Sequence, residues 1–229
     1  MKTINDQIPA SGTLPDNYQE VLSWKLTGKP MRVIAMNILS VFLFVIFGRI
    51  FSWLAFNLGK LPSEGEIKLG LSMIGLALAG VLLTLGLHEL THGLAMRMFG
   101  ASPKYGAKMK RMVLYATSPG YAYRRNNFVV IALAPFVFLS ILAVLGMWLL
   151  QGTLWVVLLG ICGALNAAGA IGDMWVTMIV LRYAPTAYVM DERDGMRVFL
   201  PKPLDETIRF PADGLHSDNT KIKTAPTTA

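Results

Sequence analysis

Four long apolar stretches dominate the chain, and more polar segments separate them. They run over about 32–58, 67–99, 128–150 and 154–181. Each stretch exceeds the roughly 20 residues that a helix needs to cross a bilayer. Only a tight turn around Gly152 separates the third from the fourth, which predicts an antiparallel pair of helices. We therefore expect an all-α integral membrane protein built on a bundle of four transmembrane helices.

The polar segments divide the chain into three parts. An N-terminal cytoplasmic segment over 1–31 is followed by a membrane domain over 32–183 and a polar cytoplasmic tail over 184–229. Within the tail, Val198, Phe199 and Leu200 predict a short strand, because β-branched and aromatic residues favour extended backbone.

The connection between the second and third apolar stretches is long for a simple loop. Two β-prone runs, Met112–Tyr115 and Tyr121–Tyr123, flank a turn at Pro119-Gly120. This pattern predicts a short β-hairpin or a re-entrant loop between helices 2 and 3. A strand edge there could hold an extended peptide by β-augmentation. An ordinary basic juxtamembrane loop would have a similar composition.

Composition agrees with a membrane location and indicates an orientation. Hydrophobic residues make up 54% of the chain and charged residues 15%, with a mean hydropathy of +0.50. A soluble domain carries about 25% charged residues. The net charge of +7 comes from basic residues beside the apolar stretches. We therefore expect contact with the lipid bilayer and no nucleic-acid partner.

The basic residues gather before the first stretch, between the second and third, and after the fourth. By the positive-inside rule, all three segments face the cytoplasm, and so do both termini. The compact four-span plan suggests a multi-pass protein of a prokaryotic plasma membrane. The sequence carries no prediction of the oligomeric state.

The second apolar stretch contains His88-Glu89-Leu90-Thr91-His92, an H-E-x-x-H motif. Histidines four residues apart lie on one face of a helix, where both imidazoles can bind the same metal ion. A glutamate beside them can take a proton from a metal-bound water, as in zinc hydrolases. The chain has only three histidines, so the motif is expected by chance on the order of 0.001 times. The alternative is a buried polar cluster that only pairs neighbouring helices.

A catalytic zinc ion needs a third protein ligand, and Asp173 is the candidate. It is the only acidic residue in the fourth apolar stretch. Intramembrane carboxylates are usually functional, although Asp173 could instead pair with Arg49 or Thr91. Asn166 lies on the same helical face, where it could orient Asp173, a bound water or the substrate carbonyl, or form only an interhelical hydrogen bond. The acidic residues beyond the last stretch are expected to be solvated charges: Asp191, Glu192 and Asp194.

Three groups of residues together resemble a known family of membrane zincins, DUF3267: His88 through Gly93, Ala134-Pro135, and Asn166 through Gly172-Asp173. The resemblance covers about residues 80–185, and more distantly the chain is similar to site-2-protease-like (M50) intramembrane proteases. It implies zinc ligands at His88, His92 and Asp173, and a general base at Glu89. The chain departs from the site-2 protease pattern N-x-x-P-x-x-x-x-D-G, since Gly169 stands at the proline position and Met174 follows the aspartate.

We therefore predict a zinc-dependent intramembrane endopeptidase that hydrolyses peptide bonds of a membrane-embedded or membrane-anchored protein. Zn²⁺ is the expected cofactor and Glu89 the catalytic residue, with Asn166 as a substrate-orienting residue. Two alternatives stay open: a catalytically inactive, metal-binding scaffold or chaperone, and a divalent-metal transporter. Against the transporter, the sequence shows no internal repeat of the kind that transporters often carry.

Overall fold

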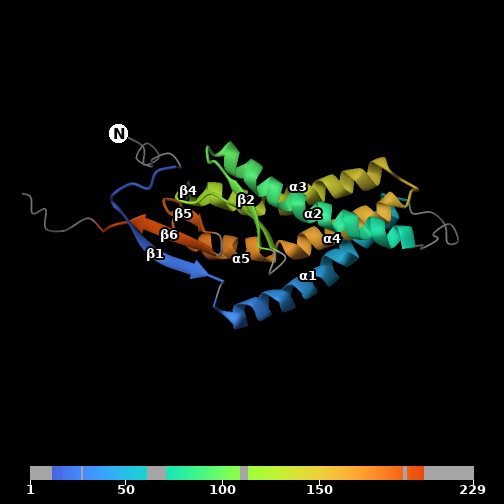
Figure 1. Cartoon of the computed structure of the whole chain (residues 1–229), viewed down its shortest axis with the longest axis horizontal. Coiled ribbons are helices and arrows are strands. Elements are labelled where there is room, and N and C mark those ends of the chain that lie inside the picture. The colour runs from blue at the N-terminus through green and yellow to red at the C-terminus, as the bar shows by residue number, and fades with distance from the viewer. Residues whose placement is uncertain (1–11, 27, 61–70, 109–112, 193–194, 204–229) are drawn as a thin grey trace, which may run out of the picture.

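The computed structural model describes residues 12–26, 28–60, 71–108, 113–192 and 195–203. The helices are α1 (Pro30–Asn57), α2 (Leu71–Met98), α3 (Arg125–Leu149), α4 (Trp155–Gly169) and α5 (Ile171–Val180). The strands are β1 (Tyr18–Lys25), β2 (Lys104–Lys108), β3 (Val113–Thr117), β4 (Ala122–Arg124), β5 (Tyr188–Glu192) and β6 (Gly195–Pro201). Figure 1 shows the long helices running side by side, with β1, β4, β5 and β6 gathered at one end.

Four helical segments of the described chain are long and apolar enough to cross a membrane, as predicted. They are Pro30–Asn57, Ile74–Met98, Arg125–Leu149 and Trp155–Val180. The last of them is not one continuous helix, because α4 ends and α5 begins around Ala170, whose backbone has φ −71° and ψ 9°. The fourth predicted span therefore contains a break at Ala170.

The expected all-α class is wrong, because the described residues also form six strands in two sheets. The larger sheet is antiparallel and has the order β1-β6-β5-β4, and the smaller one pairs β2 with β3. In the larger sheet, β1 comes from the N-terminal segment, and β6 and β5 come from the polar tail. β1 pairs with β6, so that Tyr18 lies opposite Pro201 and Lys25 lies opposite Gly195. The strand predicted at Val198–Leu200 is confirmed within β6. The rest of the tail, 204–229, lies outside the described residues, and the three-part division of the chain stays a prediction.

The connection between α2 and α3 contains a hairpin, but its strands differ from the predicted pair. β3 pairs with β2, so that Lys104 lies opposite Thr117. The second β-prone run becomes β4 and pairs with β5 of the tail. Gly120 adopts φ +79° in the turn that carries the chain from one sheet to the other, a conformation that glycine tolerates without steric cost. Met112 lies outside the described residues.

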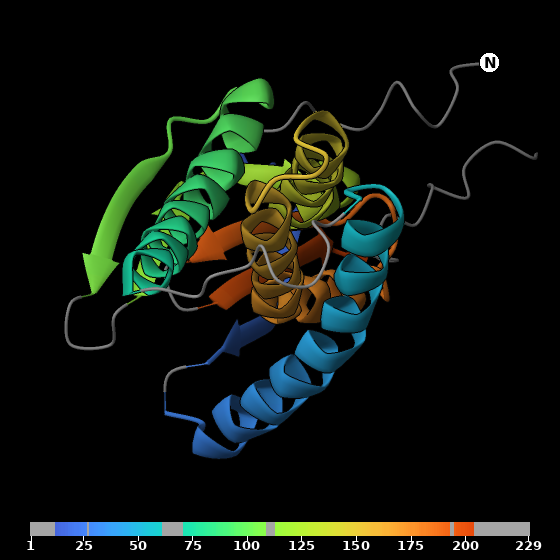
Figure 2. The same cartoon turned by 90° about the vertical axis from the view of Figure 1, so that its right-hand side faces the viewer.

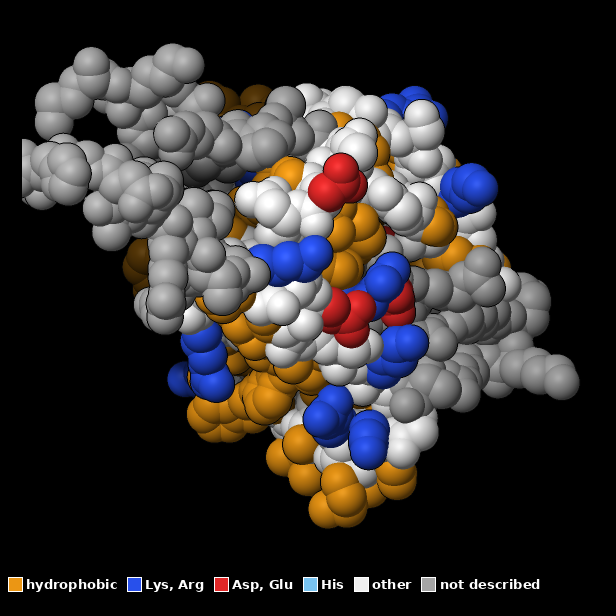
Figure 3. All heavy atoms as spheres, turned by 90° about the vertical axis from the view of Figure 1, so that its left-hand side faces the viewer, with side chains coloured by type: hydrophobic (Ala, Val, Ile, Leu, Met, Phe, Trp, Pro, Cys, Tyr) orange, Lys and Arg blue, Asp and Glu red, His pale blue; other side chains and the backbone are white. Residues whose placement is uncertain are grey.

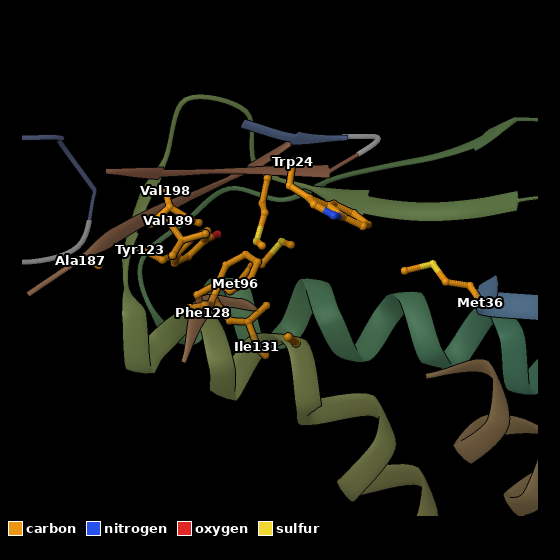
Figure 4. Close-up of a cluster of buried hydrophobic side chains, with 14 residues drawn as sticks. Trp24, Met36, Met96, Tyr123, Phe128, Ile131, Ala187, Val189 and Val198 are labelled. Carbon is orange, nitrogen blue, oxygen red and sulfur yellow. The ribbon is translucent and has the colours of Figure 1, made fainter. Parts of the chain in front are cut away.

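An apolar core joins the larger sheet to the ends of the helices (Figure 4). Tyr123, Val189 and Val198 of the sheet pack against Met96 of α2 and Phe128 of α3. Burying side chains of this kind stabilises the fold by about 1.5–3 kcal/mol each. The outer surface at this end of the molecule carries Lys and Arg side chains around a few acidic ones (Figure 3). The sheet is thus a polar-faced cap on an apolar helical bundle.

Helix α1 lies apart from α2, on the other side of α4 (Figures 1 and 2). It packs against α4 at Gly163, where an added Cβ would lie 2.4 Å from the ring of Phe51. Nearer the site, Ser40 Oγ donates a hydrogen bond to the Ala168 carbonyl at 3.1 Å. A cavity between α1, α2 and the sheet contains the candidate site.

Candidate metal centre

The three predicted ligands meet, although they come from two helices far apart in the sequence. His88 and His92 lie on α2, and Asp173 lies in the first turn of α5. His88 Nε2 is 3.2 Å from Asp173 Oδ2, and His92 Nε2 is 3.4 Å from Asp173 Oδ1. Each residue offers a ligand atom within 4.8 Å of the others, so the three could hold one metal ion.

This donor set fits zinc in both chemistry and spacing. Zinc binds imidazole nitrogen and carboxylate oxygen at about 2.0–2.1 Å, which places neighbouring ligand atoms of a tetrahedron roughly 3.3 Å apart. The two imidazoles lie 3.2 and 3.4 Å from the two different oxygens of the Asp173 carboxylate, separations close to that spacing. Two histidines and one carboxylate leave a fourth position for water, as in hydrolytic zinc sites.

Hydrogen bonds on the far side of each imidazole fix its tautomer. His88 Nδ1 lies 3.0 Å from Asn166 Oδ1, and His92 Nδ1 lies 3.0 Å from the Ile131 carbonyl. Both partners are acceptors, so each Nδ1 carries the proton and donates it. With a metal ion bound, each Nε2 would offer its lone pair to it, an arrangement that is common around bound zinc.

A proline explains why the Ile131 carbonyl is free to accept from His92. In a regular helix that carbonyl would accept a hydrogen bond from the N–H four residues later. That residue is Pro135, inside α3, and proline has no N–H. The carbonyl is therefore left for the imidazole of the neighbouring helix. From the sequence alone, Ala134-Pro135 is part of the family resemblance, and nothing in it indicates that Pro135 frees a carbonyl for His92.

Asn166 lies behind His88, and both ends of its amide are engaged. Its Oδ1 accepts from His88 Nδ1, and its Nδ2 donates to the Pro135 carbonyl at 3.2 Å. The side chain is buried, so these bonds also satisfy polar groups that would be costly to leave unpaired. The substrate-orienting role of Asn166 stays a prediction. The hydrogen bond that the structure adds orients His88, one of the three candidate metal ligands.

Glu89 is held from the opposite side by the hairpin. Its Oε2 accepts a hydrogen bond from the Ala116 backbone N–H of β3 at 2.8 Å. That N–H is therefore not paired with β2, and β3 has no second strand partner among the described residues. The other carboxylate oxygen of Glu89 is left for a water or a substrate group.

Two cavities meet at the motif. A cavity of about 880 Å³ is lined by the three ligand residues and Glu89, and a smaller one of about 220 Å³ lies on the other side of His88 and Glu89. Strand β3 borders both, with Ala116 on the larger and Leu114 on the smaller. The larger cavity is also lined by Trp24, Met36 and Met96, and Figure 4 shows Met36 set apart from the other two.

Gly169 lines both cavities at the end of α4, and a Cβ added there would meet no atom within 4 Å. Small residues near the helix break therefore leave room in the site. Gly93, which directly follows His92, is different. The side chain of Tyr105 from β2 occupies the space that a Cβ at Gly93 would need, so Tyr105 packs directly against the helix.

Comparison with family models places the motif in a known group. Residues 81–188 match the model DUF3267, described as "Putative zincin peptidase". Over this segment, which is somewhat less than half of the chain, the sequence is similar to the DUF3267 family. The segment includes the motif, Asn166 and Asp173, which confirms the resemblance to that family. Neither the curated proteins nor the solved structures gave a match, and the similarity to site-2 proteases stays a prediction.

Just beyond the DUF3267 segment, Asp191 of β5 lines the larger cavity. Its Oδ2 accepts a hydrogen bond from Thr117 Oγ1 at 2.5 Å, and burial raises its pKa to about 7. The expectation that Asp191 is a solvated charge is therefore wrong. Treating Tyr188–Glu192 as a strand would have found it, because Asp191 shares a face with the buried Val189.

Glu192, the acidic residue next to Asp191, is paired with basic side chains instead. Glu192 pairs with Lys25 at 3.3 Å and with Arg197 at 2.6 Å, in the charged surface of the sheet. Asp194 lies outside the described residues. Asp191 and Glu192 both line the larger cavity, and the Asp191 carboxylate is the one bonded to Thr117 of β3.

Proposed function

We propose that the chain is a zinc-dependent endopeptidase that hydrolyses peptide bonds of membrane-embedded or membrane-anchored proteins. The observation that carries the proposal is the meeting of His88, His92 and Asp173 in a cavity between helices that are apolar enough to span a bilayer. The match to a family of zincin peptidases supports the same class of reaction.

The chain supplies a base next to the ligands. Zinc bound by the three residues would polarise a water molecule and the peptide carbonyl. Glu89, through the oxygen that Ala116 does not hold, would take a proton from that water and deliver it to the leaving nitrogen. The bond from Ala116 keeps the carboxylate turned toward the cavity during both transfers.

The substrate segment would lie extended along β3. One edge of β3 is paired with β2, and the opposite edge borders Glu89 and both cavities. Because Glu89 holds the Ala116 N–H, a peptide would pair with the remaining backbone groups of that edge and run past the metal ligands, with side chains on either side entering one cavity each. Because a helix covers its own peptide bonds, the substrate must unwind locally before it binds in this way.

Reconstituted enzyme tests this function. Purified full-length protein, loaded with zinc, is incubated in proteoliposomes with a mixture of single-span membrane peptides, and products are identified by mass spectrometry. Wild type should generate internal cleavage products, and Glu89→Gln should bind zinc but generate none. Cleavage that persists in Glu89→Gln, or no cleavage by zinc-loaded wild type, would contradict the proposal.

A divalent-metal transporter is the second candidate, because the break at Ala170 lies between Asn166 and Asp173. Transporters often place interrupted helices beside their ion sites. Zinc uptake into the same proteoliposomes separates the two functions. Uptake that depends on Asp173 and survives in Glu89→Gln would favour transport over proteolysis.

A further inference from the structure

In the described part of the chain, the β2–β3 hairpin does not pair with the larger sheet, yet it donates the backbone hydrogen bond that holds the Glu89 carboxylate. Within the described residues, β3 has a strand partner only in β2. Its Ala116 N–H is the backbone group that holds the Glu89 carboxylate. A shift of β3 relative to α2 would therefore move this hydrogen bond away from the carboxylate.

Asp191 ties the hairpin to the larger sheet at the next residue. Thr117 Oγ1, adjacent in the chain to Ala116, donates to Asp191 Oδ2 at 2.5 Å. The Ser118 backbone N–H donates to the same carboxyl group. Thr117 and Ser118 are almost fully buried, at 2% exposure each, so their polar groups depend on these partners.

The sheet that carries Asp191 is itself firmly placed. β5 lies between β4 and β6, and its Val189 belongs to the core that contains Met96 of α2. A continuous chain of contacts thus runs from the helix through the sheet to Asp191, then through Thr117 and Ala116 back to Glu89 on the same helix. β3 is therefore held by Glu89 of α2 through Ala116 and by Asp191 of β5 through Thr117.

We propose that Asp191 is a positioning residue for Glu89, which acts by holding β3 where the Ala116 amide meets the Glu89 carboxylate. The inference rests on the proposed function only in calling Glu89 the base. Asp191 itself accepts its hydrogen bonds from Thr117 and Ser118, and no proton transfer is assigned to it.

A matched pair of substitutions at Thr117 tests the proposal in the zinc-loaded, full-length protein. Thr117→Val keeps the shape of the side chain but removes the donor, and Thr117→Ser keeps the donor. Hydrogen exchange at the Ala116 amide should accelerate on the order of tenfold in Thr117→Val and in Asp191→Ala, and should return to the wild-type rate in Thr117→Ser. Zinc content should stay at the wild-type level in all of them.

The kinetic readout separates positioning from general stability. In Thr117→Val, kcat should fall on the order of tenfold because the base is misplaced, and KM should rise as well because the peptide pairs with the same strand, whereas a general loss of stability would lower only the amount of active enzyme. Tyr123→Phe is the control, since it removes the buried hydrogen bond between Tyr123 and Ser118 without touching Thr117. Unchanged exchange in Thr117→Val, or an equal acceleration in Tyr123→Phe, would overturn the proposal. If wild type cleaves nothing, the proposed function fails and the exchange rates alone decide whether Asp191 holds β3.

Discussion

Each histidine of the centre is oriented by a residue that is not a ligand. Asn166 on α4 accepts from His88, and the Ile131 carbonyl on α3 accepts from His92. The pair of acceptors therefore couples the metal position to two further helices. Changes in either acceptor should be detected first in zinc affinity.

Substitutions at Asn166 distinguish a ligand-orienting role from a substrate-orienting role. Asn166→Ala removes the acceptor, so zinc affinity should fall roughly 10–100-fold, the range typical for loss of such a partner. Asn166→Asp keeps an acceptor for the His88 N–H and should retain most of the affinity. Competition with a chromophoric chelator measures both. Wild-type affinity in Asn166→Ala, with the loss confined to KM, would assign the residue to the substrate instead.

The sequence predicted those site residues that stand out within their own segment. The spacing of His88 and His92 defines a helical face, and Asp173 is conspicuous as a carboxylate in an apolar stretch. The acceptor role of Asn166 depends on the position of Pro135 in another helix, and the role of Asp191 depends on a strand pairing. Neither contact has a signature within its own segment.

At the scale of elements, α3 and the fourth span are each altered where they meet the site. Pro135 interrupts the hydrogen-bond pattern of α3 at the carbonyl that His92 uses, and Ala170 separates α4 from α5 between Asn166 and Asp173. Regular helices would lack both features. The structure thus places backbone irregularity where it supports the metal ligands.

Pro135→Ala should affect stability and metal binding in opposite directions. Alanine restores the N–H that can bond the Ile131 carbonyl within α3, so the helix should be at least as stable as in wild type. His92 would then share or lose its acceptor, and zinc affinity should decrease by roughly tenfold. Thermal unfolding and chelator competition on the same preparation test the two effects. An unchanged zinc affinity would show that His92 does not depend on the proline.

Two glycines of α4 form a matched pair for the packing of α1. Gly163→Ala would place a Cβ 2.4 Å from the ring of the buried Phe51, so overpacking should cost about 1–3 kcal/mol. Gly169→Ala meets no atom within 4 Å and should leave stability unchanged or slightly higher. Denaturation in mixed detergent micelles compares the two variants. Equal destabilisation would mean that α1 does not pack on α4 at Phe51.

For the whole molecule, the larger sheet brings both ends of the described chain to one side of the helical bundle. β1 and β6 are antiparallel neighbours, which places Tyr18 opposite Pro201. Lys and Arg side chains of the described residues also lie on this end of the molecule (Figure 3). The number of spans and their approximate limits were predictable, because a run of apolar residues is a local property.

The sheet could not be predicted in the same way. Its strands lie in three separate polar segments, and pairing between distant strands has no local pattern beyond β-propensity. Within the connection between α2 and α3, two β-prone runs beside a Pro-Gly turn favoured pairing with each other. In the structure the first run forms β3, which pairs with β2, and the second run forms β4, which pairs with β5.

Cysteine labelling tests the arrangement of the ends across the membrane. In a Cys162→Ser background, Asp16→Cys and Lys202→Cys should react with an impermeant maleimide only from the cytoplasmic face. Lys60→Cys, at the far end of α1, should react only from the opposite face. Labelling of Asp16→Cys and Lys202→Cys from different faces would contradict the shared sheet, and labelling of both from outside would reverse the orientation.

The metal centre is the claim on which the proposed chemistry depends, and metal content tests it most directly. Detergent-purified wild type and Asp173→Ala are compared by elemental analysis, with circular dichroism as the check on folding. The structure predicts about one zinc per chain in wild type and a sharp loss in Asp173→Ala, because only two histidines would remain. Folded wild type without stoichiometric metal, or full zinc content in Asp173→Ala, would contradict the three-residue site.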